Sequence, residues 1–503
     1  MAISGCAARP PLPPTVSPIV AQTDPSANRA VLDLQRDLTQ LFGDPSAPPA
    51  VWGVQVRSSD RGETLYRLNH GTLLIPASTM KLVTLAAAAT GLGWDFRFET
   101  QLHAHGPIDD GVLNGDLVVR GTGDPTIGSR GTSAVDDPDD LFSDWANTLK
   151  AAGIHRVTGG VVGDDRALDN GSVWPGSRLG HGWTWNDLAF GFAAPGGALT
   201  FHENVADLVI EPGPALGRLA TARVEQTESG LEVVNHIVTG PAGDAVALRL
   251  LRLPGHSTLE LYGSIPLGAD PLRRTVSVDD PTLFFLRTLR RTLVEEGIEI
   301  DGDAVDIDGV DMAAATESGI SVLIRHQSPP LSELAIDMMK RSQNVFAEAL
   351  FRTLGSKAGD GTMTASQDAV GDLLVSWSIG SNQFVIADGS GLSRYNYLTP
   401  AALVGVLEQM QSNRGSAAVF EATLPVAGHD GTLADRMAGT VAAGNARAKT
   451  GTMSNVSALA GFVDTQDGET LVFAILANNY QSGSGEINRI IDRAVETLAN
   501  FVR

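Results

Sequence analysis

Residues 75–81 (Ile-Pro-Ala-Ser-Thr-Met-Lys), which run directly into an apolar stretch at residues 82–89, constrain the fold of this chain most strongly. Pro76 suits a first helical turn, and alanine, leucine and methionine favour helix, so Ser78 is expected at the start of a buried helix. At a spacing of three residues, Ser78 and Lys81 share one helix face. A lysine whose pKa is lowered by an apolar wall can take the proton of a serine hydroxyl. The pattern therefore indicates an activated serine.

Two later stretches make this common motif specific. Average composition alone gives roughly one Ser-x-x-Lys in a chain this long. Ser342 and Asn344 form a Ser-x-Asn that opens an amphipathic helical pattern, and residues 449–452 read Lys-Thr-Gly-Thr ahead of strand-like sequence. These three motifs in this order are the signature of penicillin-recognising serine acyl-transferases. We expect no cofactor, and the 10 histidines show no zinc-ligand spacing.

Composition limits the classes of partner. The chain of 503 residues is long enough for two or three domains, and 43% hydrophobic with 19% charged residues is typical of a soluble globular protein. With 58 acidic against 36 basic residues the net charge is −22, which argues against a nucleic-acid or anionic-membrane surface. No run of 18 apolar residues occurs, so no transmembrane helix is expected.

The single cysteine, Cys6, excludes an intramolecular disulfide and a cysteine-based metal cluster. Residues 3–6 resemble a bacterial lipobox, in which the cysteine becomes lipid-modified. Only two residues precede this stretch, whereas a signal peptide needs a basic and an apolar region. Either the true start lies upstream or the match is accidental. Residues 7–28, rich in proline, alanine and serine, are expected to form an extended spacer.

Periodicity places the elements of one unit at both ends of the chain. The pattern predicts helices at 30–42 and 486–502 and hairpin strands at 51–57, 63–68, 458–463 and 470–477. The fold class is therefore α/β (α+β), an antiparallel sheet flanked by helices with inserted β-rich domains. After a segment at 1–28, we expect residues 29–98 and 320–503 to form the acyl-transferase domain, 99–170 and 276–319 an inserted domain, and 171–275 a second, nested β-rich insert.

With these pieces together, the sequence resembles the low-molecular-mass class C penicillin-binding proteins, the D-alanyl-D-alanine carboxypeptidase/endopeptidase group of peptidase family S13. The likeness runs from about Ala30 to the C-terminus and includes the long insert after the serine helix. Further matching stretches lie at residues 117–125, 182–187, 388–394, 424–428 and 430–433. The resemblance implies a serine-type D-Ala-D-Ala carboxypeptidase that acts on peptidoglycan stem peptides, with β-lactams as covalent inhibitors.

The resemblance also implies roles for the motif residues. Ser78 would attack the carbonyl between two terminal D-alanines to form an acyl-enzyme, and Lys81 would accept its proton. Ser342 would relay the proton to the leaving amine. Asn344 would bind the amide of the acyl side chain and steady Lys81. Water would then hydrolyse the ester, with Lys81 again as the base.

The Lys-Thr-Gly-Thr stretch would bind the other end of the substrate. Lys449 would raise the local positive potential, and the Thr450 and Thr452 hydroxyls would bind the terminal carboxylate. Gly451 lets the strand approach closely. The backbone N–H groups of Ser78 and Thr452 would form the oxyanion hole.

Some assignments have ordinary structural alternatives. Ser342 and Asn344 could cap a helix, since both residue types cap well. Asp388, which precedes Gly-Ser-Gly, favours a turn over an acid. Asp164 ends a strand in the insert and could be a solvated strand end. In the family an acidic residue of the insert is thought to face the amine of the stem peptide, which makes Asp164 a candidate for substrate binding.

Two other functions compete with the carboxypeptidase. A serine β-lactamase must add fast deacylation, but the Glu-x-x-Leu-Asn loop of class A enzymes is absent from the sequence. A non-catalytic murein-binding envelope protein would be free to lose Ser78, Lys81 or Lys449, and all three are present. Endopeptidase activity and oligomeric state stay open. Because murein lies outside the cytoplasm, we expect a periplasmic or outer-envelope location, with a possible lipid anchor at Cys6.

Overall fold

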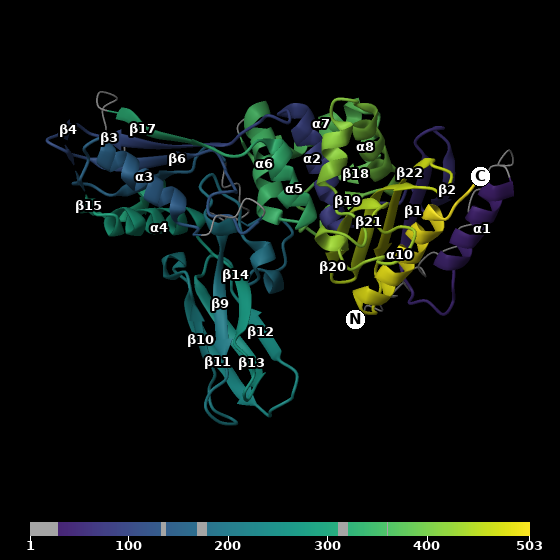
Figure 1. The fold of residues 1–503 in the computed structure, drawn as a ribbon, viewed down its shortest axis with the longest axis horizontal. Coiled ribbons are helices and arrows are strands. Elements are labelled where there is room, and N and C mark those ends of the chain that lie inside the picture. Colours follow the sequence, from purple (N-terminus) through teal and green to yellow (C-terminus); the bar gives the residue numbers. More distant parts are fainter. Residues whose placement is uncertain (1–28, 132–136, 169–178, 310–319, 360) are drawn as a thin grey trace, which may run out of the picture.

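The computed structural model describes residues 29–131, 137–168, 179–309, 320–359 and 361–503. The predictions for Cys6 and for the spacer lie outside these ranges. Figure 1 shows a large unit that contains both ends of the described chain, a second unit beside it, and a slender β-rich unit that projects from the second.

A five-stranded antiparallel sheet forms the centre of the large unit. Its strand order is β2-β1-β22-β21-β20, so strands from the two ends of the chain lie side by side (Figure 1). Both predicted hairpins are confirmed. The strands are β1 (Val51–Ser58), β2 (Thr64–Leu68), β20 (Arg447–Met453), β21 (Val456–Asp464) and β22 (Thr470–Asn478).

Helices cover both faces of this sheet, which explains why β21 and β22 are almost continuously apolar. Successive side chains point to opposite faces. Leu459 and Phe473 therefore pack with α1 (Arg29–Phe42) and α10 (Ser484–Ala499), whereas Ala460 and Ala474 pack with the helices of the other face.

The helices of the large unit fall on these two faces. Helix α10 is predicted to 502 but ends at Ala499. The helices are α1 (Arg29–Phe42) and α10 (Ser484–Ala499) on one face and α2 (Met80–Gly91), α5 (Leu331–Lys340), α6 (Asn344–Ala358), α7 (Met363–Ser376), α8 (Pro400–Ser412) and α9 (Ala417–Thr423) on the other, beside the small pair β18 (Phe384–Val385) and β19 (Tyr397–Leu398).

The inserted unit is built on a sheet of order β16-β8-β6-β3-β17, with a small sheet of order β15-β7-β5-β4 beside it. Strand β17 pairs with β3, so the predicted return to the acyl-transferase domain at 320 is wrong by the length of this strand. The elements are β3 (Glu99–His105), β4 (Ile108–Asp109), β5 (Val112–Leu113), β6 (Asp116–Gly121), α3 (Asp140–Ala151), β7 (Arg156–Val157), β8 (Val161–Asp164), α4 (Pro281–Glu295), β15 (Glu299–Ile300), β16 (Ala304–Asp306) and β17 (Ile320–Gln327).

The nested insert consists of two three-stranded sheets, β10-β9-β14 and β11-β13-β12. Strand β14 crosses the predicted boundary at 275/276, so the insert extends to the end of that strand. Its strands are β9 (Val205–Glu211), β10 (Thr221–Val224), β11 (Glu232–Gly240), β12 (Ala247–Leu251), β13 (Thr258–Pro266) and β14 (Leu272–Ser277).

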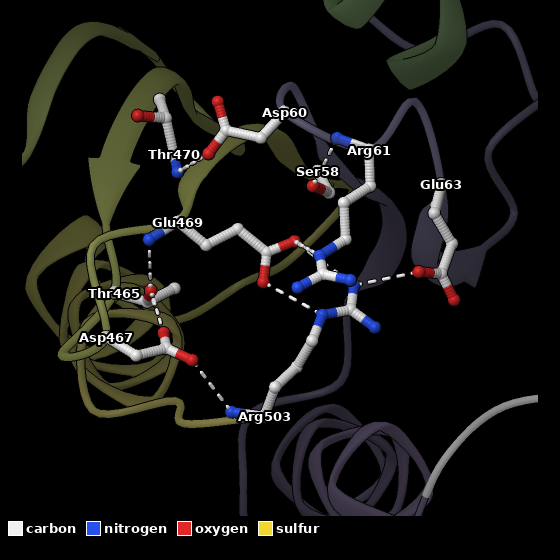
Figure 2. Close-up of polar contacts among 9 residues, drawn as sticks. All are labelled: Ser58, Asp60, Arg61, Glu63, Thr465, Asp467, Glu469, Thr470 and Arg503. Atoms are coloured by element: carbon white, nitrogen blue, oxygen red, sulfur yellow. Dashed lines mark hydrogen bonds and ion pairs between the residues drawn. The ribbon is translucent and has the colours of Figure 1, made fainter.

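An ion-pair network joins the β1–β2 turn, the β21–β22 turn and Arg503 (Figure 2). The Arg503 guanidinium contacts both carboxylate oxygens of Glu469, at 3.0 and 3.1 Å, and Glu63 at 2.8 Å. Arg61 approaches Glu469 at 3.5 Å, and the Arg503 N–H donates to Asp467 at 3.1 Å. These contacts fasten Arg503 to two turns that are distant in sequence.

Among the helices of the described ranges, none combines the length and hydropathy needed to cross a bilayer.

Candidate active site

Ser78 lies in a short turn, Ala77–Thr79, directly before α2. The sequence predicted the helix start within two residues. Ala77 has φ 46°, a left-handed conformation that non-glycine residues adopt at a cost and that clusters at functional sites. A β-carbon at Gly451 would lie 2.6 Å from the Pro76 carbonyl oxygen and 3.1 Å from the Ser78 nitrogen. Strand β20 can pass this close to the serine turn because Gly451 has no side chain.

Lys81 is fully buried, and its ammonium group makes three contacts. Its Nζ lies 2.9 Å from Ser78 Oγ, 2.5 Å from Asn344 Oδ1 and 2.8 Å from the Ser390 carbonyl oxygen. Burial lowers the pKa of Lys81 to about 7, although the charges of Asp388 and Glu348 oppose this shift. Near neutral pH a large fraction of Lys81 is therefore an uncharged amine within reach of the Ser78 proton.

A second buried lysine faces Ser342. Lys449 Nζ donates to Ser342 Oγ at 2.9 Å and to the Thr450 carbonyl at 2.8 Å. Burial and the neighbouring Lys81 charge hold the pKa of Lys449 well below its usual range. Ser342 has φ 62° in the turn between α5 and α6, which aims its side chain at Lys449.

Asn344 is oriented from both ends of its amide group. Its Nδ2 donates to the Phe192 carbonyl at 2.6 Å, and its Oδ1 accepts from Lys81. Asn344 is the first residue of α6, and the side chain of the N-cap residue Gln343 makes no capping bond. The side chains of Ser342 and Asn344 thus point to the two lysines and do not cap helix α6.

The two threonines of the last motif differ in exposure. Thr450 is buried and its Oγ1 donates to Thr432 Oγ1 at 2.7 Å, whereas Thr452 is exposed. Position 432 lies in one of the stretches that carry the family resemblance, but its role was not predicted from the sequence. Together Lys449, Thr450 and Thr452 place one ammonium group and two hydroxyl groups along β20 beside Ser78.

Asp164 lies apart from these contacts, at the end of β8 in the inserted unit. Its carboxylate accepts from Arg166 at 2.9 and 3.0 Å and from Arg120 at 3.0 Å. Burial raises the pKa of Asp164, but these two guanidinium groups outweigh it and hold the pKa below its usual range. A substrate amine would have to compete with two arginines, so the structure gives the Asp164 prediction no support.

Two buried carboxylates beneath Lys81 were not predicted as parts of the site. Asp388 accepts from the backbone N–H groups of Gly391 and Ser393 at 2.8 and 2.6 Å and from Trp183 Nε1 at 2.9 Å. The turn interpretation of Asp388 is therefore confirmed. Glu348 Oε1 accepts from the Ser390 N–H at 2.8 Å, and burial together with the Asp388 charge raises the pKa of Glu348 to about 7.

The signal for Glu348 was present in the sequence, because a helical residue four positions after Asn344 lies on the same face. Through Ser390 this carboxylate holds the loop whose carbonyl binds Lys81. A cluster of three or more side chains able to hold a metal ion is not found among the described residues.

Comparisons with known proteins point to one family. The family model for D-Ala-D-Ala carboxypeptidase 3 (S13) matches residues 34–501. A D-alanyl-D-alanine carboxypeptidase from Actinomadura sp. (strain R39) is 36% identical over 98% of this chain and 89% of its own length. D-alanyl-D-alanine carboxypeptidase DacB from Haemophilus influenzae is 29% identical over 90% of this chain and 89% of its own length.

A solved structure gives the same result. The crystal structure of penicillin binding protein 4 (dacB) from Haemophilus influenzae superposes with a TM-score of 0.79 at 27% identity, over 93% of this chain and 99% of that chain. The predicted fold class is confirmed.

Proposed function

This chain belongs to the D-Ala-D-Ala carboxypeptidase 3 (S13) family and is a serine-type D-Ala-D-Ala carboxypeptidase, and we propose that it works through an acyl-enzyme on Ser78. The observation that carries the proposal is the 2.9 Å contact between Ser78 Oγ and the buried Lys81 amine. Burial lowers the pKa of this amine to about 7, which suits a general base near neutral pH.

In the first half-reaction, uncharged Lys81 takes the Ser78 proton while Oγ bonds to the carbonyl carbon of the penultimate D-alanine. The tetrahedral intermediate collapses when the C–N bond breaks, and the proton taken by Lys81 passes through Ser342 to the leaving D-alanine amine, which returns Lys81 to its uncharged form. Ser342 suits this role because its hydroxyl is held 2.9 Å from Lys449 Nζ. Water then attacks the ester carbonyl, and Lys81 takes a proton of the water and passes it to Ser78 Oγ as the C–O bond breaks, which regenerates Ser78 and uncharged Lys81.

The terminal carboxylate of the substrate is assigned to Lys449, Thr450 and Thr452. Lys449 is buried, and its hydrogen bonds go to the neutral Ser342 hydroxyl and Thr450 carbonyl, so a bound anion would favour its charged form. The Ser78 and Thr452 N–H groups would supply the oxyanion hole, where one donor is worth about 2.7–4 kcal/mol. A β-lactam carries a carboxylate and a reactive amide, and we propose that it acylates the same serine.

The test is release of D-alanine from a peptide that ends in D-Ala-D-Ala, with Ser78→Ala as the control. Wild-type turnover with loss in the variant supports the proposal. Turnover that survives in Ser78→Ala would overturn it. A cross-linked dimer of stem peptides, assayed in parallel, measures endopeptidase activity.

We also propose a periplasmic or outer-envelope location, because the peptidoglycan substrate lies outside the cytoplasm. The lipobox-like residues 3–6 motivate the further hypothesis of a lipid anchor at Cys6. The hypothesis would be contradicted if native protein partitioned into the aqueous phase of a detergent extract and its Cys6 were unmodified.

A further inference from the structure

A carboxylate of the nested insert, that of Glu203, binds the turn that contains Ser342. Glu203 is 4% exposed, and its two oxygens accept five hydrogen bonds. From the neighbouring inserted unit, Ser129 Oγ and the Arg130 N–H donate to Oε1, each at 3.0 Å. Across the boundary, Arg341 donates to both oxygens at 2.9 and 3.2 Å, and Gln343 Nε2 donates to Oε2 at 2.8 Å.

The two residues gripped by Glu203 are the immediate neighbours of Ser342. Ser342 itself is left-handed at φ 62°, a conformation that a serine keeps only where its surroundings impose it. A carboxylate that binds the side chains on both sides of this residue supplies that constraint. It thereby fixes the direction of the Ser342 hydroxyl towards Lys449.

Glu203 is itself held in an unusual backbone. His202, Glu203 and Asn204 have φ values of 51°, 56° and 54°, three consecutive left-handed residues without a glycine. Neighbouring bonds maintain this turn: Asn204 Nδ2 donates to the Pro195 carbonyl at 2.8 Å, and the His202 N–H donates to the Ile127 carbonyl at 2.9 Å. Such strain persists where the surrounding structure over-determines it, and here it aims one carboxylate out of the insert.

The same part of the insert reaches the motif at a second point. The carbonyl of Phe192 accepts from Asn344 Nδ2 at 2.6 Å and so sets which end of that amide faces Lys81. A side chain at Gly131 of the neighbouring inserted unit would collide with Asp337 and Arg341, so that unit also lies tightly against this turn. Ser342 and Asn344 are therefore both held from outside the domain to which they belong.

We propose that Glu203 is a positioning residue for Ser342, through which the nested insert completes the active site. Glu203 acts through Arg341 and Gln343 and touches no reacting atom. The inference rests on the proposed acyl-enzyme at Ser78. Its consequence is that loss of the Glu203 carboxylate slows proton transfer through Ser342 in an enzyme that is still folded.

The test is the acylation rate constant with benzylpenicillin, measured by intact mass, together with kcat and KM on a peptide that ends in D-Ala-D-Ala. Glu203→Gln places an amide nitrogen against the Arg341 and Gln343 donors, and we expect acylation and kcat to fall about ten- to hundredfold with KM little changed. Adding Gln343→Glu reverses donor and acceptor across the same contact and should restore most of the rate.

Gln343→Met, which leaves the ion pair between Arg341 and Glu203 in place, should give a smaller loss in the same direction and covers the case in which Glu203→Gln does not fold. Asp279→Asn is the matched control, because Asp279, which follows β14, pairs with the buried Arg252 of the nested insert and makes none of the contacts described above. This control should lower the melting temperature without changing the acylation rate constant.

Wild-type acylation with an unchanged rate constant in folded Glu203→Gln would overturn the inference and leave the proposed function intact. Equal losses in Asp279→Asn and Glu203→Gln would also overturn it, because the effect would then reflect destabilisation of the insert. An unlabelled wild-type protein would instead contradict the proposed function.

Discussion

The active site and the Arg503 network treat charged side chains in opposite ways. Around Ser78, Lys81 and Lys449 are fully buried, and burial lowers the pKa of both. In the network of Figure 2, burial raises the pKa of Glu469, but hydrogen bonds from Arg503 outweigh it and lower that pKa, while the same contacts raise the pKa of Arg503.

The difference follows from what surrounds each charge. A cation buried without a contacting anion is costly, so the structure favours its neutral, basic form. Ions that contact each other stay charged and contribute to stability. We therefore expect changes at the lysines to alter the reaction and changes in the network to alter only the free energy of unfolding.

The largest effect should come from Ser78 and Lys81. Ser78→Ala should give no covalent adduct with benzylpenicillin, because the nucleophilic oxygen is gone. Lys81→Met should lower the acylation rate constant by about 10²- to 10⁴-fold, the usual contribution of a general base. Intact-mass time courses measure both, with circular dichroism to show that the variants fold. If the acylation rate constant of Lys81→Met were within tenfold of wild type, Lys81 would not be the base.

The second largest effect should come from Lys449→Met, because Lys449 is proposed to bind the terminal carboxylate of the substrate. With Lys449 in place, a peptide ending in D-Ala-D-Ala should be cleaved with a far higher kcat/KM than the same peptide with a C-terminal amide. In the variant this preference should shrink by about 10²-fold, the scale of one buried ionic contact. If both peptides lose activity equally, Lys449 does not recognise the carboxylate.

A smaller effect, on stability alone, is expected in the network. Glu469→Gln removes charge-assisted bonds to Arg503 and should lower the free energy of unfolding by about 1.5–3 kcal/mol. Urea unfolding at pH 7 measures this change. Asp33→Asn, in the exposed pair with Arg36, is the control and should change stability little. The acylation rate constant should stay within twofold of wild type in both variants. A larger loss would contradict the expectation that the network affects stability alone.

The smallest effect is the pH dependence of the difference in unfolding free energy between wild type and Glu469→Gln. The pKa of Glu469 is lower in the folded protein than its usual value of 4.5. Its contribution is therefore present above the unfolded pKa and is lost as the pH falls through the folded pKa. The stability gap between wild type and Glu469→Gln should narrow between about pH 5 and pH 3. A gap that is constant over this range would mean that the carboxylate charge does not stabilise the network.

The sequence was sufficient for the parts of the site that lie in local motifs. The spacing of Ser78 and Lys81, the position of Ser342 and Asn344, and the Lys-Thr-Gly-Thr strand all carry their chemistry within a few residues. The structure brings them into contact. The hairpins at both ends of the chain were also predictable, because alternation of apolar residues is local.

The remaining parts depend on contacts between distant segments. The three consecutive left-handed residues that include Glu203 contain no glycine, so the sequence does not indicate this turn, and the bonds of Glu203 to Arg341 and Gln343 span about 140 positions. The pairing of β17 with β3 likewise depends on tertiary structure, which is why the boundary at 320 was misplaced. Asp164 is a further example, since its position at a strand end gave no sign of its two arginine partners.

If a buried lysine whose pKa lies near 7 activates Ser78, the acylation of Ser78 must depend on pH through that pKa. The rate constant with benzylpenicillin, measured by intact mass from pH 5 to 9, should rise about tenfold per pH unit at low pH and level off above about pH 7. The adduct should map to Ser78. An acylation rate constant that does not change or that falls from pH 5 to 9 would contradict the activation of Ser78 by Lys81, and an adduct on another residue would contradict Ser78 as the nucleophile.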